Sequence, residues 1–196
     1  MALLVAAGCS GGGNPAQVMN VTTDDPGPGG IYLTASGEAL AVTGYDFPPA
    51  SGDDTFLVDG WILHLDHEIV VVDHVRLWDG PDMVPADQSK HGAEVAHADG
   101  PWATDLHLGG SLTGEGGAPE RAQPFAGIKS KDDGGAFDTT RHYGFGFDTV
   151  PATAAANKVN LDADGQSEYE LMVQNGYSVL YVGTASRPLS DPCATA

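Results

Sequence analysis

Short apolar segments separated by turns run along most of this chain, and stretches with helical periodicity are nearly absent. Apolar residues alternate with polar ones or form brief runs, which clusters of Gly, Pro and Asp interrupt at short intervals. This pattern is typical of antiparallel strands joined by tight turns. It predicts an all-β fold, an antiparallel β-sandwich of Greek-key type with long loops rich in Gly and Asp.

The expected strands are placed by their apolar runs and by the turns between them. Segments 31–35 and 39–45 are expected to form a hairpin about Ser36-Gly37, and Asn175-Gly176 predicts a second hairpin. The one run of good helix formers, 153–157, is too short to predict a stable helix. The other expected strands are 56–66, 69–78, 94–97, 102–108, 125–129, 142–148, 159–161, 168–173 and 178–185.

A long stretch from Trp61 to Trp78 contains neither Gly nor Pro. Alternation in its first part predicts one face in the core and one outside: Trp61, Leu63 and Leu65 inward, and Ile62, His64 and Asp66 outward. From Ile69 onward the pattern becomes continuously apolar. Because one straight strand of this length is unusual, we expect a bend at residues 66–68.

The first residues resemble the end of a bacterial lipoprotein signal peptide. A short apolar run is followed by the small residues Ala7 and Gly8, and then by Cys9, whose thiol would take the lipid. A signal peptide also has a basic n-region and a longer apolar core, so residues 1–8 are expected to be a truncated signal. A frayed terminus with a chance cysteine is the alternative interpretation.

The chain is therefore expected to have three parts. Residues 1–8 are the signal, residues 9–30 form a flexible tether rich in Gly, Pro and Asp, and residues 31–196 form a single β-sandwich domain. The protein would be exported across the inner membrane and held by lipid at the periplasmic face or the cell surface. A disulfide between Cys9 and Cys193 is the rival use of the same thiol, and it would remove the anchor.

Acidic residues greatly outnumber basic ones, at 27 against 8, and the net charge is −19. Nucleic acid is not expected as a partner, because binding it depends on Lys and Arg that neutralise phosphate. Anionic lipid is disfavoured for the same reason, so the membrane would be contacted only through the Cys9 anchor. The excess charge indicates solubility or, alternatively, cation capture. No protein partner is indicated.

Seven histidines are present, and all but His142 lie between His64 and His107. Neutral imidazole is a favoured ligand of zinc, copper, nickel and iron. His64 and Asp66 are ~7 Å apart on one face of a strand, and Asp105 and His107 repeat this spacing. We predict a shared transition-metal ion, copper first and zinc second, with ligands among His64, His67, His74, His91, His97, His107 and Asp66. The alternative is surface histidines, or core histidines bonded to carboxylates.

Two stretches resemble a group of uncharacterised lipoproteins from myxobacteria and their relatives. They are the segment 56–78, with Phe-Leu-Val-Asp-Gly-Trp and His-Leu-Asp-His before a valine-rich run, and the segment 99–107. The chain also resembles, more weakly, the methanobactin-associated MbnP-like periplasmic copper-binding proteins, β-sandwiches in which histidines and an oxidised tryptophan hold copper. That resemblance implies copper ligands at His64, His74, Trp78 and His91, although the spacing between the last two departs from the family.

Residues 160–168 resemble the start of an EF-hand calcium loop, with Gly165 at the sixth position. Leu171 stands at the twelfth position, where the family has a bidentate Glu. A weak calcium site in a β-hairpin is one interpretation, and a plain Asp-Gly turn is the favoured one. The oxygen donors of such a site would be Asn160, Asp162, Asp164 and Glu168.

No catalytic signature is evident, since the chain lacks a Gly-x-Ser-x-Gly elbow and a phosphate-binding loop. A zinc hydrolase on His64, His74, His107 and Glu68 is the enzymatic alternative, and nothing in the sequence favours it. We therefore predict a metal-binding lipoprotein that is not an enzyme. The rival hypothesis is a structural or adhesive surface domain without metal, which binds a protein or glycan. It predicts scattered histidines and an exposed aromatic patch at Trp78, Trp102, Tyr143 and Phe145.

Overall fold

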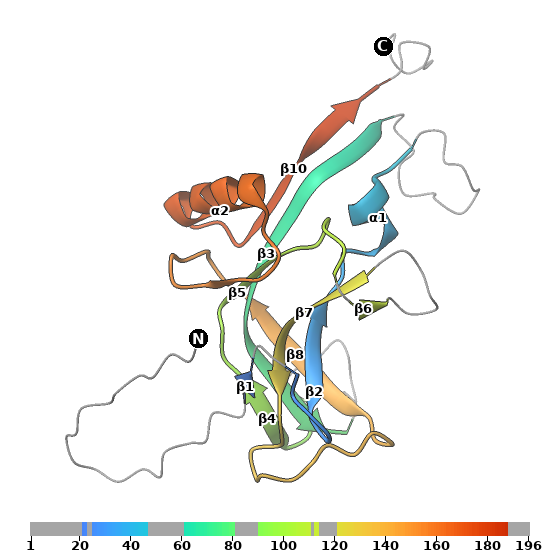
Figure 1. Ribbon diagram of the computed structural model, residues 1–196, viewed down its shortest axis with the longest axis vertical. Coiled ribbons are helices and arrows are strands. Elements are labelled where there is room, and N and C mark those ends of the chain that lie inside the picture. The colour runs from blue at the N-terminus through green and yellow to red at the C-terminus, as the bar shows by residue number, and fades with distance from the viewer. Residues whose placement is uncertain are drawn as a thin grey trace, which may run out of the picture.

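The computed structural model describes residues 21–22, 25–46, 61–80, 90–110, 112–113 and 121–187. This part of the chain is mostly β-structure with two helices, so the prediction of an all-β fold is confirmed (Figure 1). The Greek-key sandwich stays a prediction. The signal, Cys9, most of the tether and Cys193 lie outside the described residues. No described helix is long and apolar enough to cross a membrane.

The strands form two sheets. The smaller has the order β1-β7-β2 with β6 also paired to β7, and its strands are β1 (Val21–Thr22), β2 (Ile31–Ala35), β6 (Leu112–Thr113) and β7 (Arg121–Ile128). The larger has the order β10-β3-β5-β9, with β4 and β8 also paired to β3. Its strands are β3 (Ile62–Asp79), β4 (Glu94–Ala98), β5 (Trp102–Asp105), β8 (Tyr143–Thr149), β9 (Asn157–Lys158) and β10 (Val179–Ser186). All pairs are antiparallel except β5–β9.

Strand β3 is the centre of the larger sheet and runs unbroken for 18 residues. Its first half pairs with β10 and β5, and its second half pairs with β4 and β8. The bend predicted at residues 66–68 is therefore wrong as a break between strands. The change of pattern there has another cause, because Val182 pairs with His67 while Gly183 pairs with Leu65. Asp66 is the extra residue of a β-bulge.

Strand β3 has two register irregularities, and after each one the residues that faced one side of the sheet are followed by residues of opposite parity on that side. Leu63, Leu65 and Glu68 line one cavity, although Glu68 has the opposite parity, because the bulge at Asp66 intervenes. The second irregularity lies at His74, whose backbone has a φ of 50°. Asp73 pairs with Asp148 and Arg76 with Gly146, so two residues of β3, His74 and Val75, lie opposite one residue of β8.

The exchange of faces at His74 lets one strand serve two hydrophobic cores. Before it, Ile69 and Val71 pack in a cluster with Tyr169 and Met172. After it, residues of the same parity pack in the core between the two sheets: Val75 and Leu77, together with Leu33, Ala96, Trp102, Phe125 and Ile128. Trp61 was expected in the core but is 41% exposed, which corrects that prediction.

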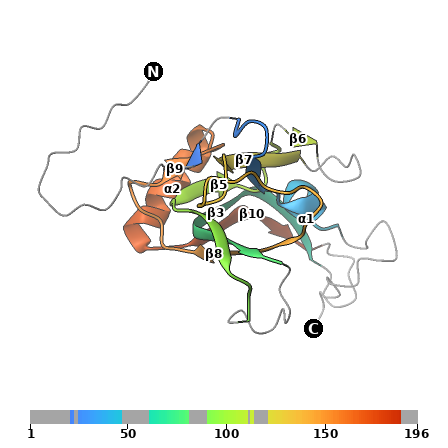
Figure 2. The ribbon, with the colours of Figure 1, turned by 90° about the horizontal axis from the view of Figure 1, so that it is seen from below.

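Two helices stand where strands were expected. Helix α1 (Glu38–Thr43) replaces the strand 39–45 of the first hairpin, and it ends before Gly44, whose φ is 77°. Helix α2 (Ala163–Asn175) replaces the strand 168–173 and the hairpin at Asn175-Gly176. Figures 1 and 2 show the two helices on opposite sides of β3.

Helix α2 forms because both of its ends are capped. The Asp162 side chain accepts a hydrogen bond from the Gly165 N–H at 2.9 Å, which satisfies a donor of the first turn. Gly176 adopts the left-handed conformation, with φ of 68°, and its N–H bonds the Met172 carbonyl. Asn-Gly serves helix C-caps as well as hairpins, so the dipeptide did not distinguish the two structures.

The left-handed backbone at His74 predicts a difference between two substitutions. His74→Gly and His74→Ala both remove the imidazole, but only Gly adopts this conformation without steric cost. We expect the free energy of unfolding of His74→Gly to exceed that of His74→Ala by about 1 kcal/mol or more, measured by urea denaturation. Equal stability, or a more stable His74→Ala, would show that the backbone here carries no strain.

Candidate metal centre

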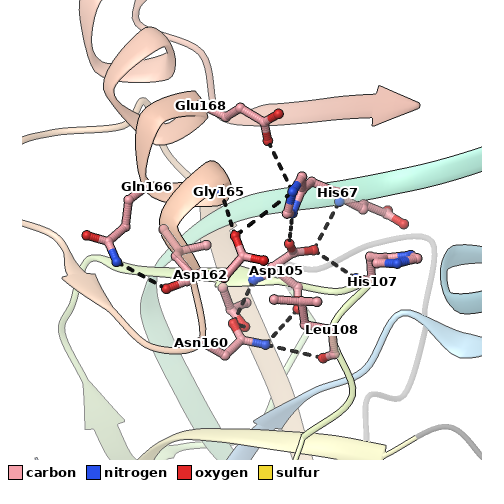
Figure 3. Close-up of polar contacts among 12 residues, drawn as sticks. His67, Asp105, His107, Leu108, Asn160, Asp162, Gly165, Gln166 and Glu168 are labelled. Carbon is pink, nitrogen blue, oxygen red and sulfur yellow. Dashed lines mark hydrogen bonds and ion pairs between the residues drawn. The ribbon is translucent and has the colours of Figure 1, made fainter. Parts of the chain in front are cut away.

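An open depression of about 590 Å³ lies where β3, the segment after β5 and the start of α2 meet. Its polar lining comes from each of these segments: Asp66, His67, His107, Asp162, Asp164 and Glu168. Figure 3 shows the His67 ring between the Asp105 carboxylate on one side and the side chains of α2 on the other. His67 is the one buried histidine among the described residues, and carboxylates line the depression beside it.

Asp105 is the buried anchor of the site, with 1% of its surface exposed. One carboxylate oxygen bonds His67 Nδ1 at 2.5 Å. The other accepts the backbone N–H groups of Glu68 at 3.0 Å and His107 at 2.9 Å. Because an ionised carboxylate can only accept, the His67 hydrogen lies on Nδ1. When the ring is neutral, the lone pair lies on Nε2 and faces the depression.

Asn160 joins the end of β5 to the segment that leads into α2. Its amide oxygen accepts the Asp105 N–H at 2.8 Å and the Thr104 hydroxyl at 3.0 Å. Its amide nitrogen donates to the carbonyls of Asp105 at 2.8 Å and Leu108 at 3.3 Å. The predicted calcium ligand Asn160 is thus committed to groups of β5 and of the segment after it, and it acts as a structural link.

Two further carboxylates face the free nitrogen of His67. Nε2 lies 4.0 Å from Asp162 Oδ1 and 3.9 Å from Glu168 Oε2. Both separations are too long for a hydrogen bond. Glu168 Oε2 is also buried, and it has no hydrogen-bond partner among the described residues. Donor atoms that bind one ion at about 2.0–2.2 Å lie roughly 3–4 Å apart, so each separation suits a cation between Nε2 and one carboxylate. The Asp162 and Glu168 oxygens do not lie within 4.8 Å of each other.

The electrostatics of the site favour a positive charge at its centre. Burial lowers the pKa of His67, but the Asp105 hydrogen bond and the charges of Asp105, Glu168 and Asp162 outweigh it, so the pKa is raised. Burial raises the pKa of Glu168, His67 opposes this, and the charges of Asp105, Asp164 and Asp162 add to it. The carboxylates therefore repel one another unless a proton or a metal ion lies between them.

The other predicted ligands are dispersed. His107 lines the same depression, but its Nδ1 lies 2.7 Å from the Ala41 carbonyl and its ring turns toward α1 (Figure 3). His64 is exposed on β3. His91 stacks on Trp78 with ring centroids 4.4 Å apart. The site of three or more histidines predicted from the sequence does not form among the described residues, which contain all seven histidines.

Two other groups of described residues bring three ligand atoms within 4.8 Å of one another, which His67, Asp162 and Glu168 do not, and each of these groups holds one histidine. They are Asp73, His74 and Asp99, and Glu94, His97 and Asp132. Arg76 already supplies a cation to both, since its guanidinium lies 2.7 Å from Asp99 and 3.9 Å from Glu94. Both groups are also more exposed than His67 and Asp105. They are therefore weaker candidates than the His67 site.

The aromatic patch of the rival hypothesis is present only in part. Trp102 is 2% exposed and belongs to the core, where it packs on Phe125 with ring centroids 5.4 Å apart. Trp78 is partly covered by His91. Phe145 is exposed as predicted, beside the exposed Phe147 on β8. The histidines are scattered, as that hypothesis expects.

Sequence reasoning included His67 among many histidines but missed its partner Asp105. One signal was available, because His67 shares parity with the buried residues Ile69 and Val71. A histidine on a buried face needs a polar partner, which in an acidic chain is most simply a carboxylate. Asp162 and Glu168 were predicted as oxygen ligands, but for calcium in a hairpin.

Comparisons of the chain with family models, with curated proteins and with solved structures found no match. The two resemblances drawn from the sequence therefore stay predictions.

The raised pKa values predict how stability depends on pH in metal-free protein. A raised His67 pKa means that the fold binds this proton more tightly than the unfolded chain does. The resulting stabilisation is complete below the ordinary value of 6.5 and is lost as pH rises through the folded-state pKa. The pKa of Glu168 is also raised, so its proton likewise stabilises the fold below its ordinary pKa of 4.5, and this contribution is lost as pH rises through the folded-state pKa.

We therefore expect the melting temperature of EDTA-treated protein to fall between pH 6 and pH 9, and to fall less in His67→Gln. Gln offers an amide N–H to Asp105 but does not titrate, so the two variants differ mainly in the proton. Differential scanning fluorimetry across this range measures the difference. Parallel pH profiles would show that the His67 proton does not contribute.

Proposed function

We propose that this protein binds a divalent transition-metal ion beside His67, with His67 Nε2 and the Asp162 and Glu168 carboxylates as its ligands. The observation that carries the proposal is that each carboxylate lies 3.9 or 4.0 Å from Nε2, a separation that suits an ion between the two groups. The exposed Asp162 side chain would turn toward Glu168 to complete the set, because their oxygens are not within 4.8 Å of each other. The buried, unpartnered Glu168 oxygen supports it, because a buried carboxylate oxygen is costly unless something pairs with it.

The bond between His67 and Asp105 gives the proposed ligand its orientation. Metal-binding histidines usually donate the second ring N–H to a carboxylate, which fixes the ring and raises the basicity of the ligating nitrogen. Asp105 holds Nδ1 in this way, and its other oxygen is held by two backbone N–H groups. The ligand would therefore be placed before any ion arrives.

The donor set favours zinc over copper. One imidazole nitrogen with carboxylate oxygens is a borderline-to-hard set, whereas Cu(I) prefers thiolate or thioether sulfur. No Cys or Met lines the depression. Cu²⁺ ranks second, because it binds most nitrogen and oxygen sites tightly. The order predicted from the sequence, copper before zinc, is thereby reversed in the proposal.

Capture of the ion fits the surroundings better than catalysis. Three ligands would leave a position open to solvent, and Asp66 and Asp164 at the rim add negative field that attracts cations. Beyond the proposed ligands, no described residue is held by its contacts as a general base. If the predicted lipid anchor holds, the site would collect metal ions close to a membrane surface.

Zinc titration of the metal-free protein by isothermal calorimetry, with elemental analysis, tests the proposal. We expect one equivalent in the wild type, and binding weakened at least 100-fold in His67→Ala and in Glu168→Gln, because each removes a ligand. Asp105→Asn should weaken binding by about 10- to 100-fold, since it acts only through His67.

His142→Ala is the matched control, because it removes an exposed histidine that does not line the depression. Circular dichroism checks that each variant is folded. Zinc binding that is equal in wild type and His67→Ala, or lost equally in His142→Ala, would overturn the proposal. A wild type that binds no zinc but binds one equivalent of Cu²⁺ through His67 would keep the site and change the metal.

A further inference from the structure

A second cavity, of about 490 Å³, lies on the other face of β3, between α1 and β10. Apolar side chains form most of its wall: Ala41, Leu63, Leu65 and Ala185. Its polar groups are few and belong to Glu68, Tyr45 and Tyr181. A concave site with apolar walls and a small number of polar groups, within roughly 300–1,000 Å³, is the usual form of a small-molecule site.

The bulge at Asp66 places Glu68 in this cavity. Without the extra residue, Glu68 would face away from Leu63 and Leu65, because residues of opposite parity point to opposite faces. The backbone of Glu68 is fixed, since its N–H donates to Asp105 Oδ1 at 3.0 Å. The carboxyl group is therefore directed by the sheet itself and does not depend on a flexible loop.

No Lys or Arg is among the described residues that line the cavity around Glu68. The Tyr181 hydroxyl hydrogen-bonds its side chain, and the nearby charge is that of Asp105, which is also negative. A half-buried carboxylate beside a second carboxylate is costly unless a positive group pairs with it.

We propose that this cavity binds a small organic cation, an ammonium group carried on an apolar body. The ammonium would pair with Glu68 and lie against the rings of Tyr45 and Tyr181, and the apolar body would cover Leu63 and Leu65. A bare metal ion suits the cavity poorly, because apolar walls cannot replace the oxygen ligands of its hydration shell. Anions are excluded by Glu68 and by the net charge of −19.

This site is separate from the proposed metal centre. It lies on the opposite face of β3, and the two cavities share no lining residue. The link between them is Asp105, which holds the His67 ring on one side and the Glu68 backbone on the other. Either proposal can therefore fail without the other.

Calorimetric titration of the full chain with 2-phenylethylamine, and with 2-phenylethanol as a neutral analogue of similar shape, tests the inference. We expect the amine to bind at least tenfold more tightly than the alcohol. Glu68→Gln should remove this preference, because the amide keeps the shape and loses the charge. Glu170→Gln, at an exposed glutamate of α2, is the matched control and should leave it unchanged.

If Glu68→Gln does not fold, Tyr181→Leu takes its place. Tyr181 is 63% exposed, so its loss should be tolerated, and amine binding should weaken severalfold as one ring of the cavity wall disappears. Equal binding of amine and alcohol would overturn the charge argument. Failure of both probes to bind at millimolar concentration, or binding unaffected by the Glu68 and Tyr181 substitutions, would overturn the site.

Discussion

The bond between His67 and the buried Asp105 carboxylate is the interaction on which the rest of this structure depends. An ionised group this deeply buried is tolerated only when its oxygens are well paired, and here an imidazole and two backbone N–H groups pair with them. Through these bonds Asp105 connects β5 to β3 and to His107, whose ring contacts the Ala41 carbonyl of α1. Breaking such a buried pair typically costs about 3–5 kcal/mol.

Two irregularities in β3 determine which of its side chains face each cavity and which face the core between the sheets. The bulge at Asp66 reverses the two faces of the strand from His67 onward, so His67 lines the cavity beside α2 and Glu68 lines the cavity beside α1. The left-handed residue His74 then returns the strand to the core between the sheets. A regular strand would place both His67 and Val75 on one face, and a single layer would have to cover both. The bulges are therefore required to place these side chains in their cavities and in the core.

The sequence predicted the strands better than it predicted the helices or the site. Strand β2 matches its predicted range, and most of the larger sheet lies where apolar alternation placed it. Helix α2 was missed because its buried stripe is narrow, with only Gly165, Tyr169 and Met172 inside, and because both of its caps also fit turns. Local pattern cannot separate such signals.

The site was harder because its geometry is non-local. His67 meets Asp105 and Glu168, which are far along the chain and belong to other elements. The number of histidines suggested that they would converge, yet sheet pairing directs His64, His74 and His97 to different surroundings. Parity alone would have marked His67 as the buried one, but it could not name its partners.

The pairing of β10 with β3 has a consequence for how the chain folds. Val179 of β10 pairs with Val70 of β3, so β10 can cover this edge of the central strand only after most of the chain has been made. Contacts of such long sequence separation close slowly, because the loop entropy is lost before the pairing compensates it. In the meantime the run Ile69-Val70-Val71-Val72 has strong strand propensity and an open edge, which favours pairing with other chains. The scarcity of positive charge, and the mutual repulsion of so many carboxylates, would keep such unfinished molecules apart.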